Sequence, residues 1–326
     1  MRPDPASLQR ALDTLYAPDA PHGVSLATVV MHHGDIVAER YGVQPDTPFG
    51  PGHPITPDST LISWSMAKSI THAAVGILVG ERRLHLDAPA SVPAWQGTPK
   101  EAITLQHLLE MRSGLLFVED YVDDGVSHCL EMLFGAASGD AATYAAALPL
   151  VTEPGSTFNY SSGTTNIVTR IIGDTVGGGR EGMETFLRDR LFTPAGMHSA
   201  IPKFDDAGTW IGSSYVFAAA RDFARFGELY RNDGATPDGR QVVPPGWRDH
   251  ARTWSAHDEQ FDYGAHWWLW REYPGAFGAH GYEGQYTVVV PSRSLVLVHL
   301  GKSPIEQRPI LNTMLRAVID CFEDGS

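Results

Sequence analysis

Hydrophobic and polar positions follow two different periods along this chain, and each period predicts one kind of element. Residues 5–16 have helical spacing, and two apolar runs, 24–31 and 36–41, are typical of strands joined by a His-Gly-Asp turn. A final helix is predicted over about 305–322. Strand-like runs return only shortly before it, at 263–270, 286–291 and 295–300.

The middle of the chain, about residues 85–250, is rich in Ala, Leu and Gly and has helical periodicity. Its apolar positions predict helices at 104–111, 143–148, 162–175, 183–191 and 219–231. The strands at the two chain ends must pair with each other, so the predicted sheet is mostly antiparallel and non-contiguous in sequence. We therefore expect an α+β fold in which helices flank this sheet and a mainly helical lobe is inserted.

The predicted elements fit one domain with two lobes. We expect a single domain over residues 1–326, with an α/β lobe at about 1–85 and 250–326. The helical lobe then covers about 86–249.

One further helical segment, from Ser65 to about Val79, begins with Ser65-Met66-Ala67-Lys68. Ser65 and Lys68 are i,i+3 neighbours on such a helix, so their side chains can meet. Apolar surroundings and the positive helix N-terminus both favour a neutral lysine amine, which can act as a base. Serine needs such a base within hydrogen-bond reach to become a nucleophile. The alternative is that the tetrapeptide occurs by chance. Burying a lysine in an apolar helix costs free energy, however, and this favours a functional role for the amine.

Composition excludes several classes of function. The formal net charge of −14 argues against nucleic acid or an anionic membrane as a partner. The two cysteines, Cys129 and Cys321, cannot form a disulfide framework. No apolar segment follows the N-terminal basic residue, so we expect no secretory signal and a cytoplasmic location. Fourteen histidines include no H-E-x-x-H pattern, and no metal or other cofactor is expected.

Two other segments combine residues suited to catalysis with turn signals. Phe158-Asn159-Tyr160-Ser161-Ser162-Gly163 precedes a predicted helix that Ser161 or Ser162 could cap, and capping alone is a sufficient explanation for it. His280-Gly281-Tyr282-Glu283-Gly284-Gln285 leads into an apolar strand, where the glycines would let the backbone approach a ligand closely. A hairpin or bulge is the structural alternative for this second segment.

Together the three segments resemble the serine β-lactamase and penicillin-recognising hydrolase superfamily. Ser65 to Lys68 matches its S-x-x-K, Tyr160 to Ser162 matches its Y-x-N in a Y-x-S variant, and His280-Gly281 occupies the K-T-G position. Within the superfamily the chain is most similar to 6-aminohexanoate-dimer hydrolases and class C-like, or family VIII, carboxylesterases. The resemblance implies a β-lactamase/transpeptidase-like fold over most of residues 20–320.

The resemblance also implies roles for individual residues. Ser65 would attack a carbonyl to form an acyl-enzyme, with Lys68 and Tyr160 sharing the base and acid roles in an order left open. The backbone N–H groups of Ser65 and Tyr282 would form the oxyanion hole. Ser162 would hydrogen-bond Lys68 or the substrate.

The substrate pocket is less well defined by the sequence. His280 and Gly281 are expected to contact substrate, but they lack the lysine and threonine of K-T-G. Tyr121, with Glu119 and Asp120 beside it, is a candidate for lining the pocket. A solvated loop is the slightly favoured interpretation of these three residues.

We therefore expect a serine hydrolase that acts through an acyl-enzyme on small ester or amide substrates. The alternatives are a β-lactamase or D,D-peptidase, and a non-catalytic binding or regulatory protein with the same fold. The sequence does not define the oligomeric state.

Overall fold

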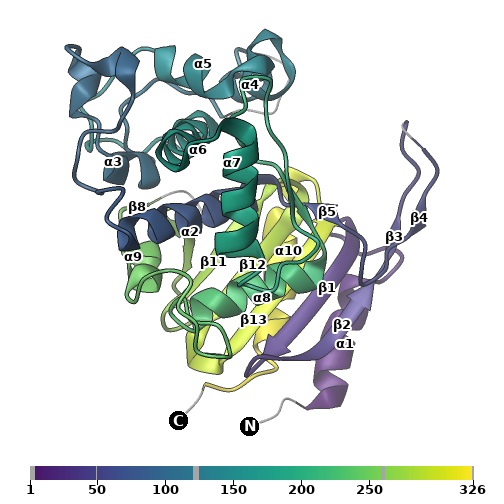
Figure 1. Ribbon diagram of the computed structural model, residues 1–326. Coiled ribbons are helices and arrows are strands. Elements are labelled where there is room, and N and C mark those ends of the chain that lie inside the picture. The colour runs from purple at the N-terminus through teal and green to yellow at the C-terminus, as the bar shows by residue number, and fades with distance from the viewer. Residues whose placement is uncertain (1–3, 49, 120–124, 258–260, 325–326) are drawn as a thin grey trace.

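A computed structural model of the chain describes residues 4–48, 50–119, 125–257 and 261–324. At its centre lies an eight-stranded antiparallel sheet that contains strands from both chain ends (Figure 1). In spatial order the strands are β2 (Asp35–Tyr41), β1 (Val24–His32), β13 (Leu295–Lys302), β12 (Gln285–Val290), β11 (Ala276–Gly281), β10 (Trp268–Trp270), β9 (Asp262–Tyr263) and β8 (Ala256–His257). β1 pairs with β13 in a register that places Val29 opposite Val298. This confirms the predicted α+β sheet built from the two ends of the chain.

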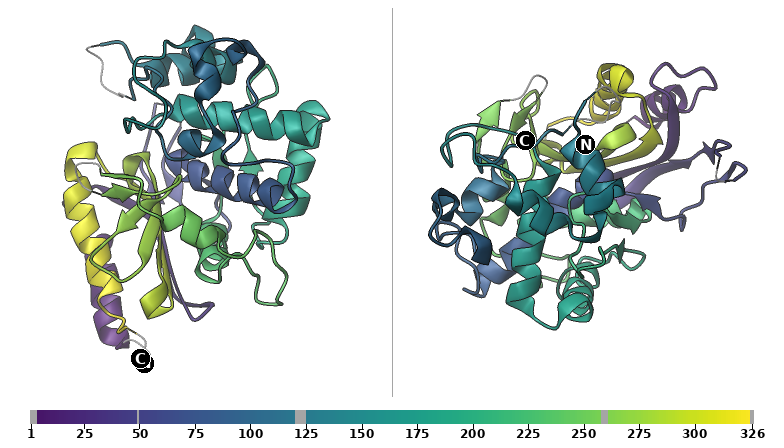
Figure 2. Two further views of the ribbon diagram at one scale, coloured as in Figure 1. Left: turned by 90° about the vertical axis from the view of Figure 1, so that its left-hand side faces the viewer. Right: turned by 90° about the horizontal axis from the view of Figure 1, so that it is seen from above.

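Helices cover both faces of the sheet because its central strands are apolar on both faces. β12 and β13 are almost entirely buried. On one face lie α1 (Pro5–Leu15) and α10 (Arg308–Ile319), and on the other lie α2 (Ala67–Gly80) and α8 (Ala220–Arg231) (Figure 2). The apolar layer on the second face packs α2 against the sheet.

Most of the remaining helices form a second body beyond α2, between it and the top of Figure 1. They are α3 (Leu105–Leu109), α4 (His128–Phe134), α5 (Ala141–Ala147), α6 (Ser162–Val176) and α7 (Gly179–Phe186). A small sheet of β5 (Leu61–Ile62), β7 (Val216–Ala218) and β6 (Ile201–Pro202) lies beside them, and β3 (Val43–Gln44) pairs with β4 (His53–Pro54). α2 therefore lies between the helical body and the main sheet.

Three predicted elements differ from the structure. The strand expected over 263–270 is split into β9 and β10, because His266 adopts a left-handed φ of 57° and its N–H donates to the Leu109 carbonyl. The helix expected over 183–191 ends at Phe186 and continues as a π-helical turn, Leu187–Phe192. The helix expected from Ser65 begins as a 3-10 turn, Trp64–Met66, before α2.

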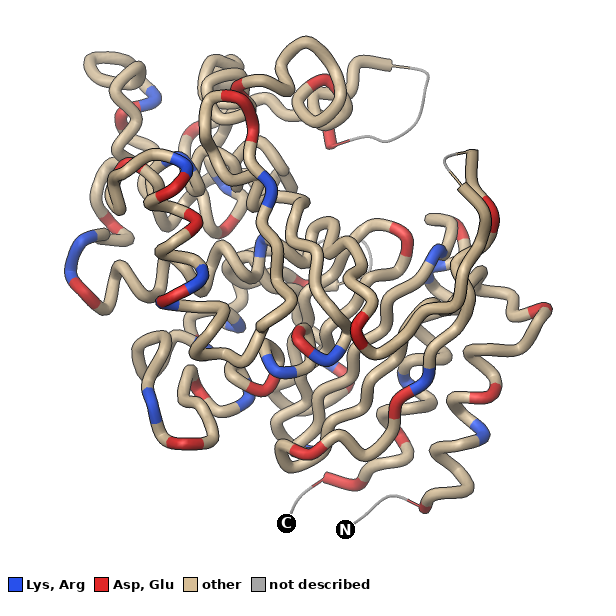
Figure 3. The backbone as a smooth tube through the Cα atoms, turned by 45° about the vertical axis from the view of Figure 1, so that its right-hand side comes forward, with Lys and Arg blue, Asp and Glu red and all other residues tan. Residues whose placement is uncertain are grey.

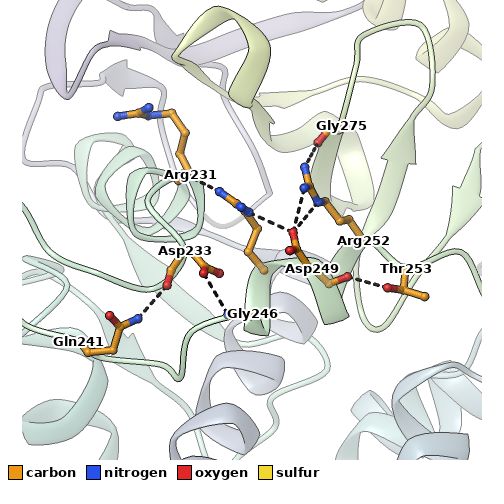
Figure 4. Close-up of polar contacts among 9 residues, drawn as sticks. Arg231, Asp233, Gln241, Gly246, Asp249, Arg252, Thr253 and Gly275 are labelled. Carbon is orange, nitrogen blue, oxygen red and sulfur yellow. Dashed lines mark hydrogen bonds and ion pairs between the residues drawn. The ribbon is translucent and has the colours of Figure 1, made fainter.

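A polar cluster fixes α9 (Trp247–Arg252) against both α8 and β11 (Figure 4). Arg248 donates to the Arg231 carbonyl at the end of α8, and Arg252 donates to the Gly275 carbonyl just before β11. On its buried face, the Trp247 indole donates to the His72 carbonyl of α2. Through Trp247, α9 thus also contacts the helix that carries Lys68.

Acidic and basic residues are interspersed along the backbone in Figure 3, and no continuous basic stripe is visible in that view. Among the described residues, the structure contains no helix with both the length and the apolar character needed to cross a membrane.

Candidate active site

Ser65 lies in a 3-10 turn that β7 holds in place at the start of α2. The Ser63 N–H donates to the Val216 carbonyl at 2.9 Å, and the Val216 N–H donates to Ser63 Oγ at 3.1 Å. Trp64 adopts a left-handed φ of 43°, a conformation that costs free energy for a bulky residue. The strained backbone leaves Ser65 and Trp64 partly exposed between the buried Ser63 and Met66.

Lys68 is almost fully buried, with 1% of its surface exposed, and its amine has three partners. The Nζ atom lies 2.9 Å from Ser65 Oγ, 2.9 Å from Ser162 Oγ and 3.0 Å from the Ser213 carbonyl oxygen. The predicted meeting of Ser65 with Lys68 is therefore present. Ser162 and Ser213 reach the same amine from distant parts of the chain.

The two serines that begin α6 have different functions. Ser161 caps the helix, because its Oγ accepts the Thr164 N–H at 2.9 Å. Ser162 points instead toward Lys68 and Glu119. Its Oγ lies 2.5 Å from Glu119 Oε1, and its N–H donates to Glu119 Oε2 at 2.7 Å. We expected Ser162 to hydrogen-bond either Lys68 or the substrate, and the structure shows the hydrogen bond with Lys68.

Hydrogen-bond chemistry determines the direction of these contacts. A carboxylate only accepts, so Ser162 donates its single hydroxyl proton to Glu119 and must accept from Lys68. The Ser213 carbonyl also only accepts, so it takes a second N–H of Lys68. One position of the amine remains, and it faces Ser65. In a neutral amine this position is the lone pair that accepts the serine proton.

Tyr160 lies beside the same amine. Lys68 Nζ is 4.9 Å from the centroid of the Tyr160 ring, which packs against Trp268 at 5.3 Å and Tyr263 at 6.0 Å between ring centroids. Burial raises the pKa of the Tyr160 phenol above its usual value. The phenol is therefore protonated at neutral pH and can donate a proton.

The end of β11 approaches the Ser65 turn closely because Gly281 has no side chain. A Cβ atom at Gly281 would lie 2.4 Å from the Ser63 carbonyl oxygen. Tyr282 follows, and its ring meets the Trp64 ring edge-on at 5.9 Å between centroids. Ser65 and Tyr282 both line a cavity of about 120 Å³. The two residues predicted to form the oxyanion hole thus share one cavity.

The His280 ring is held by two tryptophans of β10. Its Nε2 accepts the Trp270 indole N–H at 2.8 Å, and its ring stacks on Trp268. Burial, with help from the charges of Arg308 and Arg316, holds the pKa of His280 well below its usual value. The imidazole is neutral, and only Nδ1 remains for the predicted contact with substrate.

Glu119 is the residue that sequence reasoning missed. A solvated loop was the favoured interpretation for it, but the structure places its carboxylate half-buried on Ser162, one residue removed from Lys68. The signal in the sequence was the apolar run that leads directly into it at 115–118. Asp120 and Tyr121 lie outside the described residues. Within the described ranges, no group of three His, Cys, Asp or Glu side chains is arranged to hold a metal ion.

Comparisons with known proteins identify the family and the fold of the chain. The profile of the Beta-lactamase family matches residues 17–318. The 6-aminohexanoate-dimer hydrolase of Paenarthrobacter ureafaciens is 25% identical over 299 residues, and the match covers 85% of this chain and 72% of the relative. Penicillin-binding protein 4 of Amycolatopsis lactamdurans is 26% identical over 336 residues, covering 90% of this chain and 84% of the relative. A solved family VIII carboxylesterase superposes with a TM-score of 0.73 at 14% identity, over 98% of this chain and 99% of that one. The superposition confirms the β-lactamase/transpeptidase-like fold.

Proposed function

Because this chain belongs to the beta-lactamase family of serine hydrolases, we propose that it cleaves small ester or amide substrates through an acyl-enzyme on Ser65. The observation that carries the proposal is the amine of Lys68. Two of its N–H groups donate to Ser162 Oγ and the Ser213 carbonyl. The remaining position on Nζ, which is the lone pair in the neutral amine, faces the Ser65 hydroxyl at 2.9 Å.

In the proposed reaction Lys68 takes the first proton. Tyr160 already carries its own proton at neutral pH, so it cannot accept one from Ser65 in the resting enzyme. Ser65 Oγ then attacks the substrate carbonyl, and the negative charge on the carbonyl oxygen is stabilised by the N–H groups of Ser65 and Tyr282.

The leaving group receives a proton from the Lys68 and Tyr160 pair as the tetrahedral intermediate collapses. Water then hydrolyses the acyl-enzyme, with the same pair acting as its base. Glu119 accepts the Ser162 hydroxyl proton during the whole reaction. Ser162 therefore always accepts a hydrogen bond from Lys68, and this bond holds the amine in position.

Support for esters and simple amides comes from the closing strand. A neutral His280 replaces the cationic lysine of K-T-G, so this position does not attract a substrate carboxylate. The relatives include a 6-aminohexanoate-dimer hydrolase, and the carboxylesterase shares the fold.

A β-lactamase or D,D-peptidase is the second candidate, and one observation favours it. The Arg308 guanidinium carbon lies 5.9 Å from the centroid of the Tyr282 ring, so a cation lies next to the side chain of a residue that lines the Ser65 cavity. The non-catalytic alternative is disfavoured because Ser65, Lys68 and Ser162 form an unbroken hydrogen-bonded chain.

A fluorophosphonate probe tests the enzyme proposal directly. We expect a stoichiometric mass increase on the wild-type protein, located on Ser65, and none on Ser65→Ala. Ser156→Ala, at an exposed loop position, is the matched control and should be labelled like wild type. Labelling that persists in Ser65→Ala, or no labelling and no ester turnover by the wild type, would contradict the proposal.

A further inference from the structure

A second, larger cavity neighbours the cavity at Ser65 and shares part of its wall with it. Trp64, Leu133 and Phe134 line both the cavity of about 120 Å³ and a neighbouring cavity of about 460 Å³. The second is mainly aromatic and aliphatic and takes its walls from β5, β7, α4 and the loop that follows β6. Its aromatic lining also includes Phe204, Tyr215 and Phe217. A substrate bound at Ser65 therefore has an apolar channel next to it.

Lys203 brings a cation into this second cavity. Its backbone is fixed by hydrogen bonds with Tyr215 and Ile211, and its Nζ lies 5.8 Å from the centroid of the Phe217 ring. Across the part of the chain that the structure describes, its amine has no hydrogen bond and no ion pair. Two partly buried lysines differ, because Lys100 donates to the Ala146 carbonyl and Lys302 pairs with Glu283.

The carboxylate of Asp205, which lines the same cavity, already accepts two backbone hydrogen bonds. Asp205 Oδ1 accepts the Thr209 N–H at 2.7 Å, and Oδ2 accepts the Ala141 N–H at 3.1 Å. It is buried, and both of its oxygens serve to hold the backbone. The cavity therefore offers an unpaired cation and a structural anion, which suits an anionic ligand group.

The position of the proton donors indicates which part of the substrate enters. The leaving group must lie beside Lys68 and Tyr160, which supply its proton in the proposed mechanism. Neither residue lines the two cavities, whereas Ser65 and Tyr282 line the first. The channel is thus on the acyl side of the scissile bond.

We propose that this channel binds the acyl chain of the substrate and that Lys203 binds a carboxylate at the far end of that chain. The preferred substrates are then half-esters or half-amides of dicarboxylic acids with an apolar chain between the two carbonyl carbons. This inference rests on the proposed serine-hydrolase function and specifies its substrate class.

The test compares matched p-nitrophenyl esters. The first series consists of the mono-p-nitrophenyl esters of adipic, pimelic and suberic acid, each with a free carboxylate at the far end. The second series has the same acyl chains, but the far carboxylate is blocked as a methyl ester. The readout is the ratio of kcat/KM for the carboxylate to kcat/KM for the blocked ester at each chain length. We expect a ratio above one in the wild type, and a fall of at least roughly tenfold in Lys203→Met, since a charge-assisted hydrogen bond is lost.

Two further variants sharpen the test. Lys203→Glu should invert the preference, so that an acyl chain ending in an amine becomes a better substrate than one ending in a carboxylate. Arg188→Gln removes one positive charge from a partly exposed site outside both cavities and should leave the ratio unchanged.

The outcomes separate the two proposals. An unchanged ratio in Lys203→Met, or a carboxylate preference lost in Arg308→Gln instead, would overturn the role of Lys203 while leaving the hydrolase function intact. No Ser65-dependent cleavage of either series would reject the proposed function itself.

Discussion

Ser162 donates its hydroxyl proton to Glu119 across 2.5 Å, and the same carboxylate accepts the Ser162 N–H at 2.7 Å. This double contact determines what Ser162 can offer to Lys68. With its only proton directed to Glu119, Ser162 must accept from the amine, and the amine is left with one position facing Ser65.

The first prediction concerns this carboxylate. Glu119→Gln replaces one acceptor oxygen by an N–H₂ donor, so Ser162 can turn its proton toward Lys68 and the amine loses its orientation. Hydrogen bonds to charged groups contribute about 1.5–3 kcal/mol, and we expect kcat to fall at least roughly tenfold. Steady-state ester hydrolysis measures the effect. Glu153→Gln, on an exposed turn, is the control. Equal kcat in the two variants would show that Glu119 does not position Lys68.

The second prediction concerns the proton-transfer pair. Lys68→Ala and Tyr160→Phe should each lower kcat on the order of a hundredfold or more, and the double variant should lose far less than the product of the two. Single-turnover rates for all four proteins measure the coupling. Circular dichroism verifies folding, because Lys68→Ala leaves the Ser213 carbonyl without its buried donor. Simple additivity would mean that the two residues act in separate steps.

The third prediction concerns Gly281. In Gly281→Ala the new methyl group would lie 2.4 Å from the Ser63 carbonyl oxygen, so β11 must move away from the Ser65 turn. We expect kcat to fall by roughly a hundredfold, because one oxyanion donor moves with the strand. Gly173→Ala is the control, since a Cβ there meets nothing within 4 Å on helix α6. Full activity in Gly281→Ala would remove Tyr282 from the proposed oxyanion hole.

The fourth prediction concerns substrate class. We expect kcat/KM for p-nitrophenyl butyrate to exceed that for nitrocefin or benzylpenicillin by at least roughly tenfold, which equals about 1.4 kcal/mol. The reason is the neutral His280 at the position where K-T-G supplies a cation. Initial rates at neutral pH decide the comparison. Efficient cephalosporin turnover with negligible ester hydrolysis would instead favour the β-lactamase alternative and assign the carboxylate to Arg308.

The fifth prediction concerns stability in acid. Burial lowers the pKa of His250 and His299 from 6.5 to about 4 and that of His266 to about 3. The unfolded chain therefore binds protons more readily than the folded chain, and the stabilisation is complete above pH 6.5 and is lost as pH falls toward 4. We expect Tm to fall steadily over this window in calorimetry. The fall should be shallower in His250→Gln, which removes one of the three groups. A Tm that is constant between these pH values would contradict the prediction.

Features that depend on neighbouring residues could be predicted from the sequence. The periodicity of β1, β13, α6 and α8 located each of them to within about two residues. The i,i+3 spacing brought Ser65 to Lys68 because a single helical turn determines that distance. Ser161 caps α6 because its side chain and the Thr164 N–H lie three residues apart.

Features that depend on distant residues were decided by the tertiary structure. Lys68 is separated by 94 residues from Ser162 and by 145 from Ser213, so no local pattern connects them. The split of the strand predicted over 263–270 has the same origin, since His266 turns toward a carbonyl 157 residues away. Periodicity reports which face of an element is buried, but not which element it packs against. For that reason the sequence indicated the proposed nucleophile and its proposed base. Only the fold showed Glu119, the acceptors around the Lys68 amine, and the cavity that Lys203 lines.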